Sequence, residues 1–265
     1  MDNKTVPEKL LDDALASTFP ASDPLALITT TIPAAAHETE ESVQKAAPKK
    51  RMAKSKVYTL YAASQGGSMI AETAFGFTNL PVDIVDVPWD DTGWNSKRLK
   101  NLNPLGQVPT LVLPDGAIMT ESVAIVLYLA DKVRGFKLVP PPKHPSRAMF
   151  LRWLVFMVAA IYPTYTYGDV PERWVGEDAK HGAGKALRDG TDDHRKTLWR
   201  YVESQIEGPW FLGKTMSALD VYIWVMSHWR PGRDWFEKEC PKLHAISTAM
   251  KAHPVAKKVA ARNKP

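Results

Sequence analysis

The chain is poor in cysteine, with only Cys240 among its 265 residues. A single thiol allows neither an internal disulfide nor a Cys-x-x-Cys redox pair, which excludes a disulfide-stapled fold and argues against a thiol-disulfide reductase. We expect Cys240 to be a packed core thiol. The seven histidines show no metal-ligand spacing, so the sequence predicts no metal site.

Long hydrophobic runs are also missing. No apolar run reaches the length of a membrane span, and no basic start with an apolar core marks a signal peptide, so we expect no membrane partner. The net charge is +5, but the basic residues do not gather on one helix with interleaved aromatics, so no nucleic-acid partner is expected. With 45% hydrophobic residues, the composition indicates a globular protein, and we expect it in the cytoplasm.

Composition divides the chain into four parts. Residues 1–55 are rich in Ala, Thr, Pro, Glu and Lys, which predicts a linker-like N-terminal extension. Residues 56–135 alternate strand and helix patterns. Residues 136–146 contain three consecutive prolines and predict an interdomain linker, and everything from 147 to 265 has helical patterning.

The second part predicts a small α/β domain. A strand at 57–61, a small-residue loop and a helix over 68–78 precede a strand at 82–87. Two short strands at 110–113 and 117–119 flank the turn sequence Pro-Asp-Gly, and a helix follows. The β-α-β half must be parallel with a right-handed connection.

The last part predicts a helical bundle. Phe150, Trp153, Leu154, Met157 and Ile161 keep a helical spacing, and Pro163 should kink or end that helix. A second long helix is expected over 191–206. Ser217 followed three residues later by Asp220 is a capping-box-like start for an apolar helix.

One set of motifs is more specific than these patterns. Gln107-Val108-Pro109 precedes the hairpin, and Glu121-Ser122 stands at the start of the helix that follows it. This order resembles the glutathione-binding half of glutathione S-transferases, and the resemblance runs from about residue 56 to the C-terminus. It implies a thioredoxin-like domain followed by an all-helical substrate domain, in a homodimer.

The resemblance also implies a reaction. The protein would activate glutathione as co-substrate for attack on a small apolar electrophile, by conjugation, ether cleavage or peroxide reduction. The alternative is a non-catalytic binding or scaffold protein on the same fold, because fold alone does not decide function.

Activating glutathione requires a group that stabilises the thiolate, because the pKa of a free thiol is ~8.5 and most of it is protonated at neutral pH. The loop at 64–68 offers hydroxyls and a helix N-terminus. Ser68, in a Gly-Ser-Met run resembling serine-type bacterial members, is our first candidate, Ser64 the second and Tyr61 the third; the alternative for Ser68 is a helix cap. Gly67 stands where related thiol enzymes carry a cysteine.

The remaining contacts are implied by the resemblance. The cysteinyl backbone of glutathione would pair with Val108, next to a cis bond to Pro109, and its γ-glutamyl carboxylate would meet Ser122 and the helix N-terminus. Glu121 would face the ammonium group. The glycine carboxylate would meet residues from the set Trp94, Lys97, Lys100 and Gln107, although solvated lysines are an equal alternative.

The electrophile would contact an aromatic wall at the kink expected around Pro163. Its candidates are Tyr162, Tyr165, Tyr167 and Trp174, with Trp229 and Trp235 less well supported. A buried aromatic core is the alternative for the same residues.

Overall fold

The computed structural model describes residues 57–89 and 99–264, and of 178–180 the backbone only. The chain divides into two units, Met1–Lys49 and Lys50–Pro265, and all described residues belong to the second. The expectations for residues 1–55, Trp94 and Lys97 lie outside the described residues. The domain boundaries drawn above stay predictions.

A four-stranded sheet forms the first half of this unit. Its strands are β1 (Tyr58–Ala62), β2 (Val82–Asp86), β3 (Thr110–Val112) and β4 (Ile118–Met119), in the order β2-β1-β3-β4. β1 runs parallel to β2 and antiparallel to β3, which is antiparallel to β4. Alternate residues of β1 are buried, as a sheet with one covered face requires. The predicted thioredoxin-like half is confirmed.

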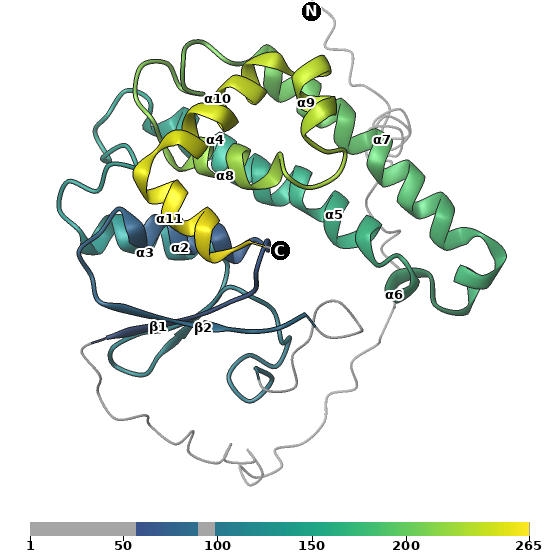
Figure 1. The fold of residues 1–265 in the computed structure, drawn as a ribbon, viewed down its shortest axis with the longest axis horizontal. Helices are drawn as coiled ribbons and strands as arrows, with labels where there is room; N and C mark the ends of the chain where they lie inside the picture. Colours follow the sequence, from purple (N-terminus) through teal and green to yellow (C-terminus); the bar gives the residue numbers. More distant parts are fainter. Residues whose placement is uncertain (1–56, 90–98, 265) are drawn as a thin grey trace, which may run out of the picture. The chain divides into compact units, whose positions relative to one another are not determined.

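The remaining elements are helical, which confirms the second half of the predicted fold. Helices α2 and α3 lie between the sheet and the other helices (Figure 1). The helices are α2 (Ser68–Gly76), α3 (Ser122–Lys132), α4 (Arg147–Phe156), α5 (Tyr162–Asp169), α6 (Glu172–Val175), α7 (Ala183–Ser204), α8 (Ala218–Met226), α9 (Arg233–Glu239), α10 (Pro241–Ala252) and α11 (Pro254–Arg262).

The expected kink or end at Pro163 is replaced by a different irregularity. A π-helical turn, Met157–Ile161, joins α4 to α5, so that Arg147–Asp169 is one helix of 23 residues. Pro163 is the second residue of α5, directly after the π-helical turn, and has no N–H to donate to the turn before it. The widened turn upstream absorbs the change in hydrogen bonding, so the helix continues. Helix α7 also differs, beginning at Ala183 rather than near residue 191.

The same helix corrects the expectation that no apolar run reaches membrane length. By length and composition alone, Arg147–Asp169 could cross a membrane, with a mean hydropathy of 1.4 over its best window. Core helices satisfy that criterion too, and the expected inner face packs in the core. Its five residues Phe150, Trp153, Leu154, Met157 and Ile161 are all buried.

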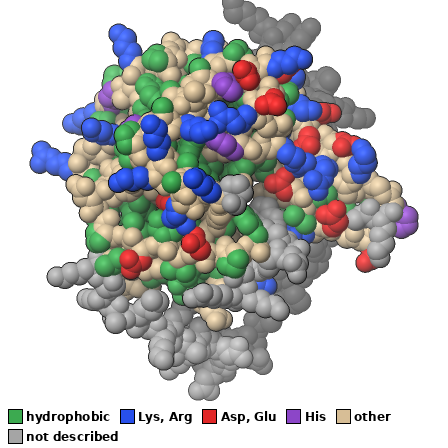
Figure 2. Space-filling view, viewed as in Figure 1, with side chains coloured by type: hydrophobic (Ala, Val, Ile, Leu, Met, Phe, Trp, Pro, Cys, Tyr) green, Lys and Arg blue, Asp and Glu red, His purple; other side chains and the backbone are tan. Residues whose placement is uncertain are grey.

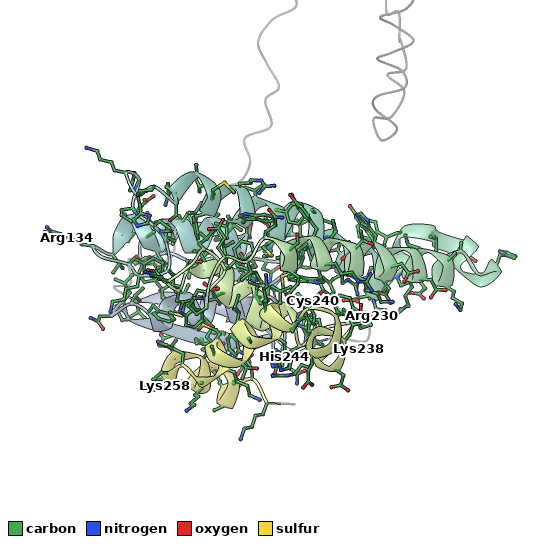
Figure 3. The ribbon with its side chains drawn as sticks, turned by 90° about the horizontal axis from the view of Figure 1, so that it is seen from above. Arg134, Arg230, Lys238, Cys240, His244 and Lys258 are labelled. Atoms are coloured by element: carbon green, nitrogen blue, oxygen red, sulfur yellow. The ribbon has the colours of Figure 1, made fainter. Side chains whose placement is uncertain are left out.

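Cys240 lies fully buried between α9 and α10 (Figure 3). Burial raises the pKa of its thiol to about 12, so it stays protonated and behaves as a small core residue.

Lys and Arg side chains gather on the outer surface of the C-terminal helices (Figure 2). Exposed cations there include Lys251, Lys257 and Lys258.

The predicted capping box starts α8. The Asp220 carboxylate accepts hydrogen bonds from the Ser217 N–H at 2.7 Å and, nine residues upstream, from the Phe211 N–H at 2.8 Å. Asp220 is fully buried, and burial raises its pKa to about 6 against the pull of these donors. The Asp220 carboxylate therefore links the start of α8 to the loop that contains Phe211.

We expect Asp220→Asn to lower the free energy of unfolding by about 1–3 kcal/mol. The amide NH₂ would replace one carboxylate oxygen and would face a backbone N–H, so that this hydrogen bond would be lost. Urea denaturation at pH 7 measures this. Asp193→Asn, on the exposed side of α7, is the matched control and should change stability by less than about 0.5 kcal/mol. Equal effects of the two substitutions would contradict the assigned role of Asp220.

Candidate functional site

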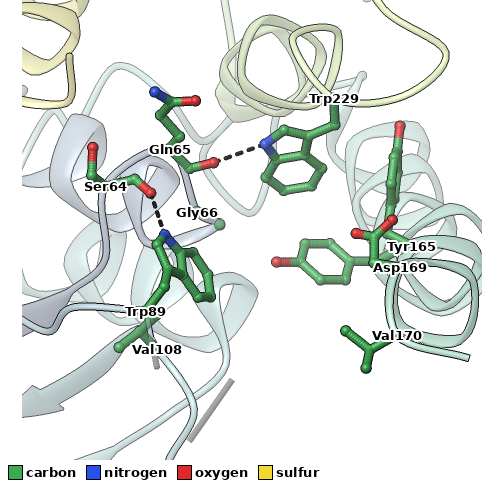
Figure 4. Close-up of a pocket in the computed structure, with 11 residues that line it drawn as sticks. Ser64, Gln65, Gly66, Trp89, Val108, Tyr165, Asp169, Val170 and Trp229 are labelled. Atoms are coloured by element: carbon green, nitrogen blue, oxygen red, sulfur yellow. Dashed lines mark hydrogen bonds between the residues drawn. The ribbon is translucent and has the colours of Figure 1, made fainter. Parts of the chain in front are cut away.

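The loop between β1 and α2 is held by two tryptophans from different halves of the fold. Trp89, just after β2, donates its indole N–H to the Ser64 carbonyl at 2.9 Å. Trp229, after α8, donates to the Gln65 carbonyl at 2.9 Å (Figure 4). Gln65 has a positive φ of 59°. The two indoles therefore hold consecutive carbonyls of a tightly turned loop.

The two glycines of this loop make room for aromatic side chains of the protein itself. A Cβ on Gly66 would lie 3.0 Å from Cζ2 of Trp89. A Cβ on Gly67 would overlap the hydroxyl oxygen of Tyr162, which comes from α5. The loop backbone is therefore packed closely against two rings of the protein.

A first cavity, of about 310 Å³, opens beside this loop. Aromatic rings form much of its wall, and Asp169 brings one carboxylate (Figure 4). It is lined by Ser64, Gln65, Gly66, Gly67, Trp89, Val108, Tyr162, Tyr165, Asp169, Val170 and Trp229. An apolar, aromatic compound fits such a wall.

A second cavity, of about 250 Å³, contains the most specific motif of the sequence. Val108 and Tyr162 line both cavities, so the two adjoin. The Val108–Pro109 bond is cis, as expected. The second cavity is lined by Gln107, Val108, Pro109, Thr120, Glu121, Ser122, Val158, Tyr162, Pro163, Thr166 and Tyr167.

The start of α3 forms the polar end of the second cavity. Glu121 precedes the helix with φ 66° and ψ 110°, a conformation that costs a non-glycine residue energy and is concentrated at functional sites. The Ser122 hydroxyl lies 2.6 Å from the hydroxyl of Tyr222, which is fully buried on α8. When Tyr222 donates, the Ser122 proton is free to bond an anion in the cavity.

The three candidate hydroxyls for the thiolate do not converge on the cavities. Ser68 is fully buried, and its hydroxyl donates to the Ala63 carbonyl and accepts from the Ala63 N–H, both at 3.0 Å. Ser64 lines the first cavity, but its hydroxyl lies 3.5 Å from the Lys264 carbonyl and points away from Trp89 (Figure 4). Tyr61, on β1, lines neither cavity.

Of the other residues expected to bind substrates, some line a cavity and some do not. Gln107, Glu121 and Ser122 come together, whereas Lys100 is exposed and lines neither cavity. Trp174 also lines neither: it packs edge-on against Tyr167, with its ring centroid 4.7 Å away. Its indole donates to the Thr166 carbonyl at 3.1 Å.

A buried charge network supports the aromatic wall from behind. The guanidinium of Arg195, fully buried, lies 4.0 Å from the ring centroid of Tyr165 and pairs with Asp192 at 2.8 Å. Arg230 bridges Asp192 and the cavity residue Asp169. The network fixes the position of Asp169, and burial raises the pKa of Tyr165, which stays a neutral phenol.

The C-terminal helix holds α2 in place. Arg262 of α11 donates to Glu72 of α2 at 2.6 Å and also pairs with Asp86 of β2. Glu72 is only 6% exposed, so its carboxylate depends on this partner. The loop and α2 are thus anchored by Trp89 after β2, by Trp229 after α8 and by Arg262 of α11.

Sequence reasoning missed several lining residues. Trp89 could have been found, because it follows a parallel strand whose carboxyl end meets that of β1. Asp169 and Val170 gave no local signal, because only the packing of distant elements brings them to the first cavity. The same holds for Tyr222, which lines neither cavity but contacts Ser122.

Comparisons with known sequences agree with this arrangement. A family model described as Glutathione S-transferase, N-terminal domain, matches residues 70–132. The chain is 36% identical over 206 residues to the uncharacterized GST-like protein YncG of Escherichia coli (strain K12), covering 77% of this chain and 97% of that protein. It is 29% identical over 169 residues to glutathione S-transferase GstA of Escherichia coli O157:H7, covering 60% and 73%.

Solved structures show the same fold. A glutathione transferase homolog from Sulfitobacter with bound glutathione has a TM-score of 0.67 at 22% identity, covering 78% of this chain and 98% of that one. The bacterial GST BphK, in a ternary complex, has a TM-score of 0.63 at 23% identity, covering 77% and 98%.

We expect Trp229→Phe to loosen the loop at 64–67, because the ring remains while the hydrogen bond to Gln65 is lost, at about 0.5–1.5 kcal/mol. Hydrogen exchange of the loop amides should accelerate. Trp174→Phe, which removes a comparable indole bond to the Thr166 carbonyl on α5, is the matched control because it does not touch the loop. Unchanged exchange in Trp229→Phe would show that the indole does not hold the loop.

Proposed function

This chain belongs to the glutathione S-transferase family, and from that premise we propose that it is an active glutathione transferase. The observation that carries the proposal is the pair of adjoining cavities, one polar and one aromatic, that share Val108 and Tyr162. A transferase needs such an arrangement, because the thiol must reach from a peptide site into a site for an apolar partner.

The second cavity is proposed to hold glutathione. Within the described part of the chain, the backbone N–H and C=O of Val108 have no hydrogen-bond partner and can pair with the cysteinyl residue. The γ-glutamyl carboxylate would meet the Ser122 hydroxyl and the N-terminus of α3, where the helix dipole favours negative charge. Glu121 would face the ammonium group, and Gln107 would be a donor for the glycine carboxylate.

The thiol is proposed to lie beside the loop at 64–67. There the backbone N–H groups of Gly67 and Ser68, at the start of α2, donate no hydrogen bond to any described residue. They would favour the thiolate over the thiol. The hydroxyls of Ser68, Ser64 and Tyr61 would act on the sulfur only after leaving the positions described above, so the backbone is the better-supported group.

The first cavity is proposed to take a small apolar electrophile. Its aromatic wall includes Tyr162, Tyr165 and Trp229, whose rings meet edge to face with centroids 5.1 to 6.5 Å apart. Conjugation, ether cleavage and peroxide reduction all use the same thiolate, and the proposal includes all three reactions. Tyr167 lines the glutathione side instead, and Trp174 supports Tyr167.

A cytoplasmic homodimer completes the proposal. Helix α4 presents exposed apolar side chains, with Met149 44% and Val155 55% exposed, and Ile118 of β4 is 41% exposed. Apolar groups on the first helix of the second domain fit an interface with a second copy.

Calorimetric titration with glutathione, together with the ultraviolet band of the bound thiolate, tests the function. We expect the wild-type protein to bind glutathione as the thiolate at neutral pH. We expect Ser122→Ala to weaken binding by about 1–3 kcal/mol, because a charged carboxylate loses a hydrogen bond.

Ser204→Ala, at the end of α7 and outside both cavities, is the matched control and should bind like wild type. Wild-type affinity in Ser122→Ala would refute the proposed carboxylate position. If the wild-type protein fails to bind glutathione, the chain is a non-catalytic binding or scaffold protein on this fold.

The dimer can be tested by sedimentation. We expect the wild-type protein to sediment as a dimer and Val155→Glu to sediment as a monomer, because the charge would be buried without a partner. His194→Glu on the exposed face of α7 is the control and should stay dimeric. A wild-type monomer would contradict the proposed interface.

A further inference from the structure

We infer that the hydroxyl of Tyr162, supplied by the helical domain, donates the hydrogen bond that stabilises the glutathione thiolate. This inference rests on the proposed function and assigns the activating hydroxyl to a residue that the sequence placed on the electrophile wall. Tyr162 would be a catalytic residue, because its oxygen would contact the reacting sulfur.

The first argument is the glycine at position 67. Its φ of −62° and ψ of −15° are ordinary helical angles that any residue adopts, so the backbone does not require glycine there. What requires it is space, because a Cβ would overlap the Tyr162 hydroxyl oxygen and would lie 3.1 Å from its Cζ. The phenol therefore occupies the place from which a side chain at position 67 would reach the thiol.

The second argument is that the Tyr162 hydroxyl is available while the alternatives are committed. Among the described residues, no hydrogen-bond partner engages the Tyr162 hydroxyl, whereas both bonds of the Ser68 hydroxyl go to Ala63. The Ser64 hydroxyl is directed to the C-terminal segment. A phenol left unpaired at a cavity wall has its donor free for a ligand.

The third argument is position. Tyr162 lines both cavities, as Val108 does, so its ring lies where the peptide site and the aromatic site meet. Gly67 lines the first cavity as well, and its N–H and that of Ser68, at the start of α2, donate no hydrogen bond to any described residue. A sulfur at this junction could accept from the phenol and from the helix N-terminus together.

The fourth argument is protonation. Burial, and then the charges of Asp169 and Glu121, raise the pKa of Tyr162, so the phenol keeps its proton at neutral pH. On ionisation the thiol would lose its proton to bulk water, while Tyr162 would retain its own and donate a hydrogen bond. The phenol thus acts as a donor and not as a base.

The test is the pH dependence of the thiolate absorbance of bound glutathione. We expect Tyr162→Phe to raise the midpoint of ionisation by about one pH unit, since a donor to the charged form has been removed. Glutathione affinity at low pH, where the thiol is neutral, should change less than twofold. Tyr201→Phe on the outer face of α7 is the matched control and should leave the midpoint unchanged.

A second variant keeps the test decisive if Tyr162→Phe perturbs packing. Gly67→Ala leaves the phenol in the chain but displaces its hydroxyl, so it should raise the midpoint in the wild-type background. In the Tyr162→Phe background the same substitution should add little, because no hydroxyl remains to be displaced. This non-additivity distinguishes a shared site from two independent effects.

The failures are separable. If the wild-type protein does not bind glutathione, the proposed function fails and this inference fails with it. If the wild type forms the thiolate but Tyr162→Phe and Gly67→Ala leave the midpoint unchanged, the inference alone is overturned. If the Gly67→Ala shift is equally large in the Tyr162→Phe background, the phenol is not the group that Gly67 accommodates, and the inference is again overturned.

Discussion

The close packing of the β1–α2 loop against rings from both halves of the fold is the constraint on which the rest depends. Trp89 holds the loop from the sheet side and Trp229 from the helical side, each through one hydrogen bond to a carbonyl. Because Gly66 and Gly67 have no side chains, the rings approach the backbone directly. Two consecutive carbonyls are thus tied to the protein, while the N–H groups of Gly67 and Ser68 donate no hydrogen bond to any described residue.

The helix that begins the second domain depends on this packing as well. Its π-helical turn, Met157–Ile161, precedes Tyr162, and a wider turn changes the direction of every side chain that follows. Pro163 is the second residue of α5, directly after this turn, and has no N–H to donate to the turn before it. The irregular turn and the proline therefore belong together, and they bring one tyrosine to the junction of the two cavities.

Behind the site, charged groups replace the usual apolar packing. Arg195 is fully buried under the Tyr165 ring, and a buried guanidinium is tolerated only when carboxylates and carbonyls surround it. In the middle of α2, the buried Glu72 carboxylate is likewise paired with Arg262 of α11. Such pairs add little net stability, but each specifies one arrangement of neighbouring helices, as a site shared between two domains requires.

The sequence by itself determined the two-part architecture, the succession of strands and helices along the chain, the capping box at Ser217 and the motif residues Gln107, Glu121 and Ser122. Each is a local signal: a period of side chains, a turn residue or a motif short enough to act within one element. It did not determine which hydroxyls face the cavities. Ser68 has the right place in the chain, but its hydroxyl bonds Ala63. Tyr162 lies about a hundred residues away in the chain and reaches Gly67 only because helix α5 packs against the β1–α2 loop. Tertiary structure decided this, because the direction of a side chain depends on contacts between residues far apart in the sequence.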